Sequence, residues 1–408
     1  MNRLFRSGRP LAITMWDFSW LERRWPGAGY EDWAVALDEL VARGYDAVRI
    51  DAYPHLLAVD PARTWEIIPP WDQSLWGAQT RVDIQVWPAL RDFIRLCAAR
   101  GVQVALSTWF QDDATHQRES LASARAHAGI WLRTLELLEQ ENLLEHVLYV
   151  DLCNEWPFPH WAPFFHRPAG AAPGDWRIPA SLAWMQESVA LVRARYPDLP
   201  FTYSFSDCLD DPASHTIDVG FLDFLEPHCW MTSMTEFYAR VDYNFERFDP
   251  KGYRNVADRA ERLYRSDPDH WKAGLAAIID RRVAWSLAQN KPLVTTEGWS
   301  IVDYKDGPRL PWHWVMELNA WAVERVSRTG RWAAICTSNF AGPQFHGMWR
   351  DVAWHQRLNG IIKSGNLPSP PLHSPTHPGA LRHPSPEGTQ STPAEIPSRE
   401  GCPSGRGV

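Results

Sequence analysis

The chain has 408 residues, 45% of them hydrophobic, and a formal net charge of −8. This length fits one large domain or two ordinary ones with a sizeable buried core. The acidic balance and the lack of basic clusters argue against nucleic acid as a partner. The 24 tryptophans offer flat faces on which sugar rings stack, although such side chains also fill large cores.

The cysteines and the N-terminus indicate the compartment. The 6 cysteines have neither CxxC nor Cys/His spacing, so the sequence predicts no metal site. The first residues lack the apolar stretch of a signal peptide, and no apolar run is long enough to span a bilayer. We therefore expect a reduced, cytoplasmic protein without a membrane partner. The oligomeric state stays open.

Apolar runs typical of buried strands alternate with amphipathic helical segments along the chain. The first half predicts strands over residues 11–16, 45–51, 102–110 and 147–152, and helices over 30–43, 85–100, 120–140 and 181–196. Gly44 and Gly101 directly follow two of these helices, as is usual at a helix end. A long loop rich in Pro and Trp is expected between the second strand and the second helix.

The second half continues the alternation. It predicts strands over 201–206, 221–230, 292–297 and 332–339, and helices over 275–290, 312–328 and 352–363. The connection between the first two of these strands is short, and we expect no regular helix in it. A polar, aromatic insertion over 232–272 is long enough to be a functional loop with helical pieces of its own.

Eight strands interleaved with helices predict an α/β fold, a (β/α)8 TIM barrel with enlarged βα loops, over residues 1–363. A doubly wound open sheet is the second choice, but no Gly-rich phosphate turn follows the first strand. Residues 364–408 are dominated by Pro, Ser, Gly and His. Such a segment cannot bury enough apolar surface to fold, so we predict a disordered tail without a catalytic role.

Two of the predicted strands end in carboxylates. The fourth strand leads into Asn154 and Glu155, and the seventh ends in Glu297, where Gly298 permits a sharp turn. In a barrel of parallel strands, active sites are built at the carboxyl ends of the strands. Strands four and seven lie across the barrel mouth from each other. We therefore predict that Glu155 and Glu297 face each other over one substrate.

These strand ends resemble those of the (β/α)8 glycoside hydrolases of clan A, and most of all their cellulase-like branch of endoglucanases and mannanases. The resemblance implies that Glu155 is the acid/base, that Glu297 is the nucleophile, and that Asn154 holds the sugar 2-hydroxyl. It also implies that Arg49, at the end of strand two, hydrogen-bonds the nucleophile. His228 resembles the His of a His-x-Tyr pair in this family.

Retaining hydrolysis of a glycosidic bond needs two carboxyl groups about 5 Å apart. One protonates the leaving oxygen, and the other attacks the anomeric carbon to form a covalent glycosyl intermediate. These roles predict a raised pKa for Glu155 and a depressed one for Glu297. The expected partner is a carbohydrate substrate with β-linked sugars, and neither a metal nor an organic cofactor is implied.

The sequence departs from the family pattern at three strand ends. Trp230 replaces a tyrosine that hydrogen-bonds the nucleophile, strand three ends at Trp109 without the usual histidine, and strand eight ends near Asn339 without a stacking tryptophan. These three residues remain candidates for substrate binding, together with two further strand-end tryptophans, Trp16 and Trp299.

Other interpretations stay open. Glu155 and Glu297 can be structural ion-pair partners, and Arg49 can pair with a neighbouring carboxylate such as Asp17 or Asp51. Asp151 precedes Glu155 by an even number of residues, so either side chain can point inward. A sugar-binding barrel that has lost turnover also fits the pattern. A metal-dependent barrel hydrolase fits less well, because no His-x-His follows strand one.

Overall fold

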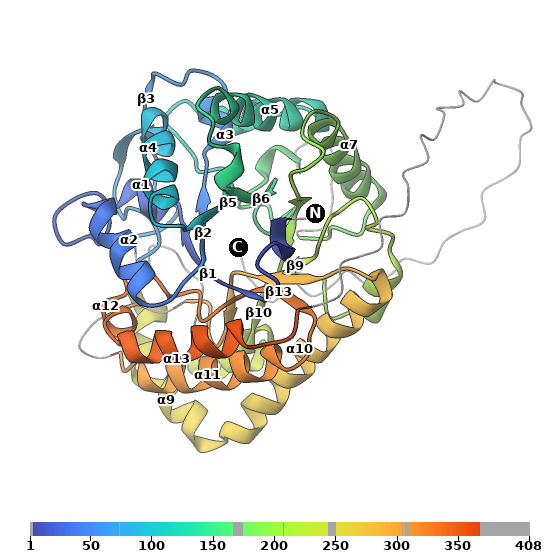
Figure 1. The fold of residues 1–408 in the computed structure, drawn as a ribbon. Helices are drawn as coiled ribbons and strands as arrows, with labels where there is room; N and C mark the ends of the chain where they lie inside the picture. Colours follow the sequence, from blue (N-terminus) through green and yellow to red (C-terminus); the bar gives the residue numbers. More distant parts are fainter. Residues whose placement is uncertain are drawn as a thin grey trace, which may run out of the picture.

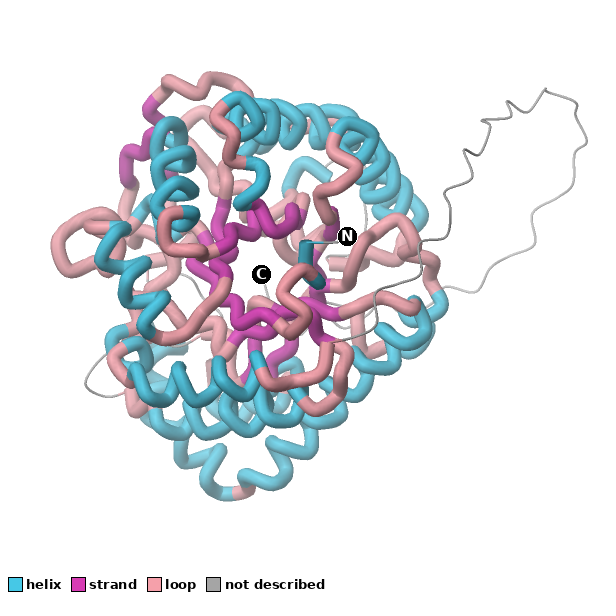
Figure 2. The backbone as a smooth tube through the Cα atoms, in the orientation of Figure 1, coloured by secondary structure: helices cyan, strands magenta, loops and turns pink. Residues whose placement is uncertain are grey.

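The computed structural model describes residues 3–367 except 73, 166–173, 207, 244–249, 304 and 307–309. The strands form a central ring, and helices surround it (Figure 1; Figure 2). The predicted (β/α)8 barrel is thereby confirmed. Most of the predicted tail, residues 368–408, lies outside the described residues, so its disorder stays a prediction.

Seven strands form one parallel sheet, in the order β11, β13, β1, β2, β5, β6, β7. Every residue of β1, β2, β6 and β13 is buried, as expected for parallel strands that are covered on both faces. The strand bounds are β1 Leu11–Asp17, β2 Ala47–Asp51, β5 Gln103–Ser107, β6 Val147–Asp151, β7 Phe201–Thr202, β11 Leu293–Thr295 and β13 Trp332–Cys336.

Short parallel pairs close the ring at the fifth, sixth and seventh barrel strands. The pairs are β8 (Ser204–Phe205) with β9 (Glu226–Pro227), and β10 (Cys229–Trp230) with β12 (Gly298–Trp299). Strands five and six are thus shorter and more broken than the predicted 201–206 and 221–230. Pro227 contributes to this because it cannot donate a hydrogen bond to a ladder.

Gly298 also has a role in the pairing of two strands. It is not among the residues with a positive φ, and it pairs with Cys229 within the ring. A Cβ atom at this position would lie 3.0 Å from the carbonyl oxygen of Cys229. Glycine therefore lets the seventh barrel strand approach the sixth closely.

Seven long helices cover the outside of the ring. They are α2 (Trp33–Ala42), α4 (Val86–Ala98), α5 (Ala124–Gln140), α7 (Pro179–Arg195), α10 (Pro268–Gln289), α11 (His313–Ser327) and α13 (Val352–Lys363). α2 begins later than predicted because the Asp32 side chain accepts hydrogen bonds from the first backbone N–H groups of the helix. α10 begins earlier than predicted, and the Asp267 side chain caps it in the same way.

Additional elements enlarge the loops. The insertion at 232–272 contains α8 (Glu236–Val241) and α9 (Pro250–Ser266), which confirms its predicted helical pieces. The loop after β2 carries α3 (Pro54–Leu57) and an antiparallel hairpin of β3 (Thr64–Ile67) and β4 (Val82–Gln85), which we did not predict. Between β8 and β9 the described residues form only one short 3-10 turn, Pro212–Thr216, in agreement with the prediction. Two further short helices are α1 (Ser19–Glu22) and α12 (His346–Trp349).

The N-terminal segment plugs one end of the barrel. Leu4 and Phe5 are buried and pack with Leu11, Ile13, Tyr149 and further residues that come from strands all around the ring. Arg3, in the 3-10 turn Arg3–Phe5, also donates hydrogen bonds to the carbonyls of Leu144, in the turn before β6, and Val147, the first residue of β6. The end at which the strands begin is therefore filled, which leaves the carboxyl ends of the strands for a site.

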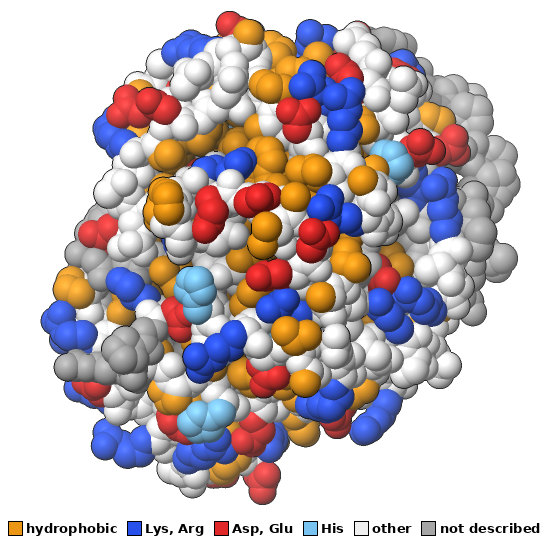
Figure 3. Space-filling view, turned by 60° about the vertical axis from the view of Figure 1, so that its left-hand side comes forward, with side chains coloured by type: hydrophobic (Ala, Val, Ile, Leu, Met, Phe, Trp, Pro, Cys, Tyr) orange, Lys and Arg blue, Asp and Glu red, His pale blue; other side chains and the backbone are white. Residues whose placement is uncertain are grey.

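Two observations bear on the expected lack of a membrane or nucleic-acid partner, which stays a prediction. Within the described residues, no helix is both long and apolar enough to cross a bilayer. Acidic and basic side chains are mixed over the face in Figure 3, and its described part carries no continuous basic patch. The predicted cytoplasmic location stays a prediction.

Candidate active site

Two glutamates meet at the carboxyl ends of the barrel strands. Glu155 follows β6, and Glu297 lies between β11 and β12. One carboxylate oxygen of each, together with one ring nitrogen of His228, lies within 4.8 Å of the other two. Retaining glycosidases hold their carboxyl groups about 5 Å apart, whereas inverting enzymes hold them roughly 6.5–9.5 Å apart. The side chains keep 5% and 6% of their surface exposed, so the pair is deep but reached by solvent.

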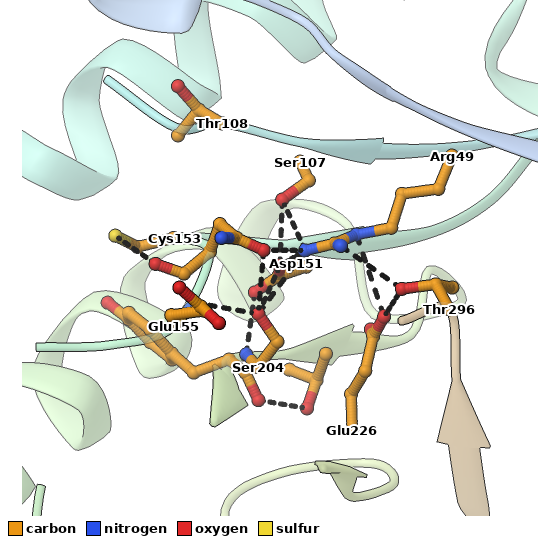
Figure 4. A network of polar contacts seen from close by, with 12 residues as sticks. Arg49, Ser107, Thr108, Asp151, Cys153, Glu155, Ser204, Glu226 and Thr296 are labelled. Carbon is orange, nitrogen blue, oxygen red and sulfur yellow. Dashed lines mark hydrogen bonds and ion pairs between the residues drawn. The ribbon is translucent and has the colours of Figure 1, made fainter. Parts of the chain in front are cut away.

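Arg49 on β2 lies between these strand ends and links them (Figure 4). Its guanidinium is fully buried and spreads its N–H groups over several strands. Nη1 donates to Thr296 Oγ1 at 3.1 Å and to Glu297 Oε1 at 3.4 Å, on the side of the seventh barrel strand. Nη2 contacts the side chains on the other side. Its acceptors are Asn154 Oδ1 at 2.8 Å, Ser107 Oγ at 3.0 Å, Ser204 Oγ at 3.2 Å and a carboxylate oxygen of Asp151.

The charges around Arg49 keep it a cation. Burial by itself lowers its pKa, but the acidic side chains around it, among them Asp151 and Glu297, outweigh burial and raise the pKa above the ordinary value. The carboxyl groups within ion-pair distance of the guanidinium are those of Asp151, Glu226 and Glu297. The open question of Asp151 is thereby answered, because its side chain points to Arg49.

Ser204 on β8 fixes the end of the fourth barrel strand. Its hydroxyl donates to Asp151 Oδ2 at 3.0 Å and accepts from the backbone N–H of Glu155 at 3.0 Å. Glu155 has a φ of 49°, in the left-handed region that few non-glycine residues occupy. The hydroxyl of Ser204 thus helps to hold an unfavourable backbone conformation, which is common at functional sites.

The Glu155 carboxylate is held from two sides. Trp161 Nε1 lies 3.1 Å from Oε2 and donates to it, and His228 Nδ1 lies 3.1 Å from Oε1. His228 Nδ1 is also 3.7 Å from Glu297 Oε2, so the imidazole faces both glutamates. Burial lowers the pKa of His228, although the hydrogen bond with Glu155 opposes this shift. A neutral imidazole between the carboxylates follows at neutral pH.

Glu155, Glu297 and His228 are also close enough together to hold a metal ion. However, Arg49 already places a permanent positive charge 3.4 Å from Glu297 Oε1. A metal ion beside this guanidinium would be repelled by it. We therefore assign no metal to the site, and the expected lack of a cofactor stays a prediction.

Comparison with known proteins places the chain in a family. Residues 13–363 match the profile of the cellulase-like family described as sugar-binding cellulase-like. The chain belongs to this cellulase-like family. A search of curated proteins finds no match.

Solved structures agree with this family and with the barrel. A protein from Parabacteroides distasonis ATCC 8503, provisionally named a glycoside hydrolase, is 46% identical, with a TM-score of 0.86 over 88% of this chain and 95% of its own. The GH5_18 protein from Streptomyces cattleya in complex with GlcNAc is 12% identical, with a TM-score of 0.50 over 88% of this chain and 82% of its own. The second likeness concerns the fold alone.

The cellulase-like chain brings two of the candidate tryptophans to the site. The guanidinium of Arg49 lies over the ring of Trp109, with 4.6 Å between Cζ and the ring centroid. Trp230 packs its ring edge-on against His228 at a centroid distance of 5.3 Å. Both side chains are almost fully buried, so they form part of the site wall.

The other three candidates lie in contacts of their own. Trp16 is fully buried in an aromatic cluster with Tyr30, Phe93 and Trp349. Trp299 is fully buried and donates from Nε1 to the carbonyl of Cys336 at 3.0 Å. Asn339 is buried and donates to the carbonyl of Val302 at 3.3 Å. A role of these three residues in substrate binding stays a prediction.

Several residues of the site escaped the sequence analysis. The structure adds Ser204, Glu226, Thr296 and Trp161 to the groups around Arg49 and Glu155. Glu226 could have been predicted as a functional residue, because it is a carboxylate inside the predicted strand 221–230. Ser204 and Thr296 had none, since serine and threonine are common in strands.

Proposed function

We propose that this protein is a retaining glycoside hydrolase that cleaves β-linked oligosaccharides or glycosides by double displacement. Glu155 serves as the acid/base and Glu297 as the nucleophile. The observation that supports this most is the distance of at most 4.8 Å between carboxylate oxygens of the two glutamates at the barrel mouth. This distance suits direct attack by one carboxylate, but leaves too little room for the water that an inverting enzyme places there.

The surroundings of the two carboxylates support opposite roles. Arg49 pairs with Glu297 and favours its ionised form, as a nucleophile requires. Glu155 instead faces the imidazole of His228 and the indole N–H of Trp161, and neither of these groups carries a permanent positive charge. In the first step Glu155 gives its proton to the leaving oxygen while Glu297 bonds to the anomeric carbon. In the second step Glu155 takes a proton from water, the water oxygen bonds to the anomeric carbon, and the bond between that carbon and Glu297 breaks.

Asn154 suits the recognition of a sugar hydroxyl. Its amide oxygen already accepts a hydrogen bond from Arg49 at 2.8 Å. This bond orients the side chain and leaves its NH2 group as the donor toward substrate. A hydrogen bond to the sugar 2-hydroxyl strengthens in the transition state of glycoside hydrolysis.

The decisive experiment traps the intermediate. The protein is incubated with a panel of 2-deoxy-2-fluoro β-glycosides that carry an activated leaving group, and its intact mass is measured. We expect a stable glycosyl adduct that peptide mapping assigns to Glu297 and that Glu297→Gln abolishes. Glu155→Gln should still form the adduct with an activated leaving group, but should hydrolyse the corresponding unfluorinated glycosyl intermediate slowly.

Other outcomes separate the alternatives. An adduct on a residue other than Glu297, or a product with inverted anomeric configuration by NMR, would refute the proposed roles. Binding of oligosaccharides without an adduct or a product across the panel would favour a sugar-binding barrel without turnover. Full activity after treatment with a chelator would dismiss a metal-dependent mechanism.

A further inference from the structure

Glu226 on β9 is a fully buried carboxyl group that approaches Arg49 from the side opposite Ser107 (Figure 4). Its hydrogen bonds and its contact with Arg49 all fall on one oxygen. Oε1 accepts from Thr296 Oγ1 at 2.6 Å and from Tyr149 Oη at 3.3 Å, and it lies 3.5 Å from Arg49 Nε. Arg49 Nε itself makes no hydrogen bond, so this last contact is loose.

The other oxygen of Glu226 is the unusual one. Oε2 is buried and has no hydrogen-bond partner. A carboxylate shares its negative charge between both oxygens, and leaving one of them buried without a donor is costly. Protonation lowers this cost, because Oε2 then carries no charge while Oε1 becomes a carbonyl oxygen with two donors.

The charges of the neighbourhood favour the same state. Arg49 is the cation of this cluster, and it already pairs with Asp151 and Glu297. The remaining titratable groups around Glu226 are Tyr149 on β6, His228 between β9 and β10, and Cys336 on β13. None of these supplies a second fixed positive charge, because the pKa of His228 is lowered and those of Tyr149 and Cys336 are raised. Ionised Glu226 would therefore add a second uncompensated negative charge to a buried cluster.

We propose that Glu226 is a positioning residue that acts in its uncharged form: it orients Thr296 and leaves the guanidinium of Arg49 to Asp151 and Glu297. This inference rests on the proposed function, in which Glu297 is the nucleophile. When Glu226 ionises, it competes with Asp151 and Glu297 for the guanidinium of Arg49. The 3.4 Å contact between Arg49 and Glu297 is then weakened. Burial raises the pKa of Glu226 to about 7, against the opposing charge of Arg49, so this change falls within the neutral range.

The kinetic test compares the wild type with Glu226→Gln, an isosteric and permanently neutral side chain. The substrate is a β-glycoside with a dinitrophenolate leaving group, which needs no proton from Glu155, so that kcat/KM reports on Glu297. We expect similar kcat/KM for both proteins at pH 6. At pH 8 we expect the wild type, but not Glu226→Gln, to have lost up to about tenfold in kcat/KM, because about nine-tenths of Glu226 is then ionised.

Asp17 provides a matched control. It is a fully buried acid with a pKa of about 7, raised by burial, and its Oδ2 also lacks a hydrogen-bond partner. Asp17→Asn should leave the pH dependence of kcat/KM as in the wild type. A folded Glu226→Gln protein that is as impaired at pH 6 as at pH 8 would overturn the proposal, because the ionised carboxylate would then be the working form.

A measurement without turnover separates this proposal from the proposed function. At pH 6 the infrared spectrum of the wild type should contain a protonated-carboxyl band that Glu226→Gln lacks and that disappears in the wild type near pH 7. Thr296→Val removes a donor to Oε1, so it should move the midpoint of this band to higher pH. If neither variant changes the band, Glu226 is ionised and the inference is refuted, whatever the protein hydrolyses. If the band behaves as expected while no glycoside is cleaved, only the proposed function fails.

Discussion

Arg49 shows how much one buried side chain can organise. Its planar guanidinium contacts Asp151 and Asn154 on one side and Thr296 and Glu297 on the other. A lysine ammonium keeps the charge but is a single point that cannot reach both sides at once. We expect Arg49→Lys to lower kcat by about 10²–10³-fold, because preorganised electrostatic contacts to a reacting group are typically worth that much.

Steady-state kinetics on an active β-glycoside measure this effect. Arg325 provides the control, since its ion pair with Asp280 is on the surface and Arg325→Lys should change kcat by less than about twofold. Thermal unfolding of both variants shows whether the loss reflects chemistry or folding. An Arg49→Lys enzyme with wild-type kcat would show that only the charge of residue 49 matters.

The contacts of Arg49 also show which residues of the site can be predicted from the sequence and which cannot. Glu155, Glu297 and Arg49 could be predicted as neighbours, because each directly follows or ends an apolar run and the ends of parallel strands meet. The hydroxyl of Ser204 could not, because its reach to Asp151 depends on the register of a strand that is only two residues long. Side-chain hydrogen bonds across strands carry no signal along the chain.

At the scale of elements, the N-terminal 3-10 turn stabilises the barrel from the end opposite the candidate site. Phe5 is 1% exposed and packs inside the ring with residues from several strands. We expect Phe5→Ala to lower the free energy of unfolding by about 3–5 kcal/mol, since it leaves a cavity in a closed core. KM should stay unchanged, because the site lies at the carboxyl ends of the strands.

Urea unfolding and substrate kinetics at the same temperature test this separation. Val35→Ala is the control, because Val35 is 54% exposed on α2 and its truncation should cost less than about 0.5 kcal/mol. A change in KM as large as the change in stability would indicate that the plug and the site are coupled through the barrel.

The sequence predicts the boundary of an element only where residues next to that boundary determine it. The start of α2 was readable in retrospect from Asp32, whose side chain caps the helix. The breaks in strands five and six were not, because apolar residues continue through 201–206 and 221–230 and only the packing of the ring decides which of them pair. The hairpin of β3 and β4 was missed because its strands have only four residues each, too few for a clear pattern within a loop rich in Pro and Trp.

At the scale of the whole molecule, the alternation of strands and helices was sufficient to predict the barrel. A parallel strand needs a crossover before the next one, and eight such units close most simply on themselves. The alternation could not predict which side chains fill the interior of the barrel. The carboxyl end of the ring holds several buried acids, which only a folded chain brings together.

These buried acids and a set of buried histidines make stability depend on pH. Burial raises the pKa of Asp17, Asp51 and Glu226 to about 7, and that of Glu22 to about 8. Burial lowers the pKa of His55 and His127 to about 4, and that of His355 to about 3. In an unfolded chain the acids ionise near pH 4 and the histidines near pH 6.5.

The acids and the histidines have opposite effects on the pH dependence of stability, and this determines the pH range in which the acids dominate. Between about pH 4 and 6.5 the folded acids retain protons that the unfolded chain has lost, while unfolded histidines bind protons that the folded ones do not. Above about pH 6.5 the histidines are neutral in both states, and only the acids still differ. Because the folded state then holds more protons, the free energy of unfolding should fall by roughly 3 kcal/mol between pH 6.5 and 8.5.

Urea unfolding at a series of pH values across this window measures the slope. Glu22→Gln should flatten it most, because Glu22 has the highest pKa of the four acids and so retains its proton over the widest range. An exposed acid such as Glu145 serves as the control, and Glu145→Gln should leave the slope unchanged. A free energy of unfolding that rises with pH above 6.5 would contradict this prediction. It would show that these acids are already ionised in the folded protein and that other contacts compensate their charges.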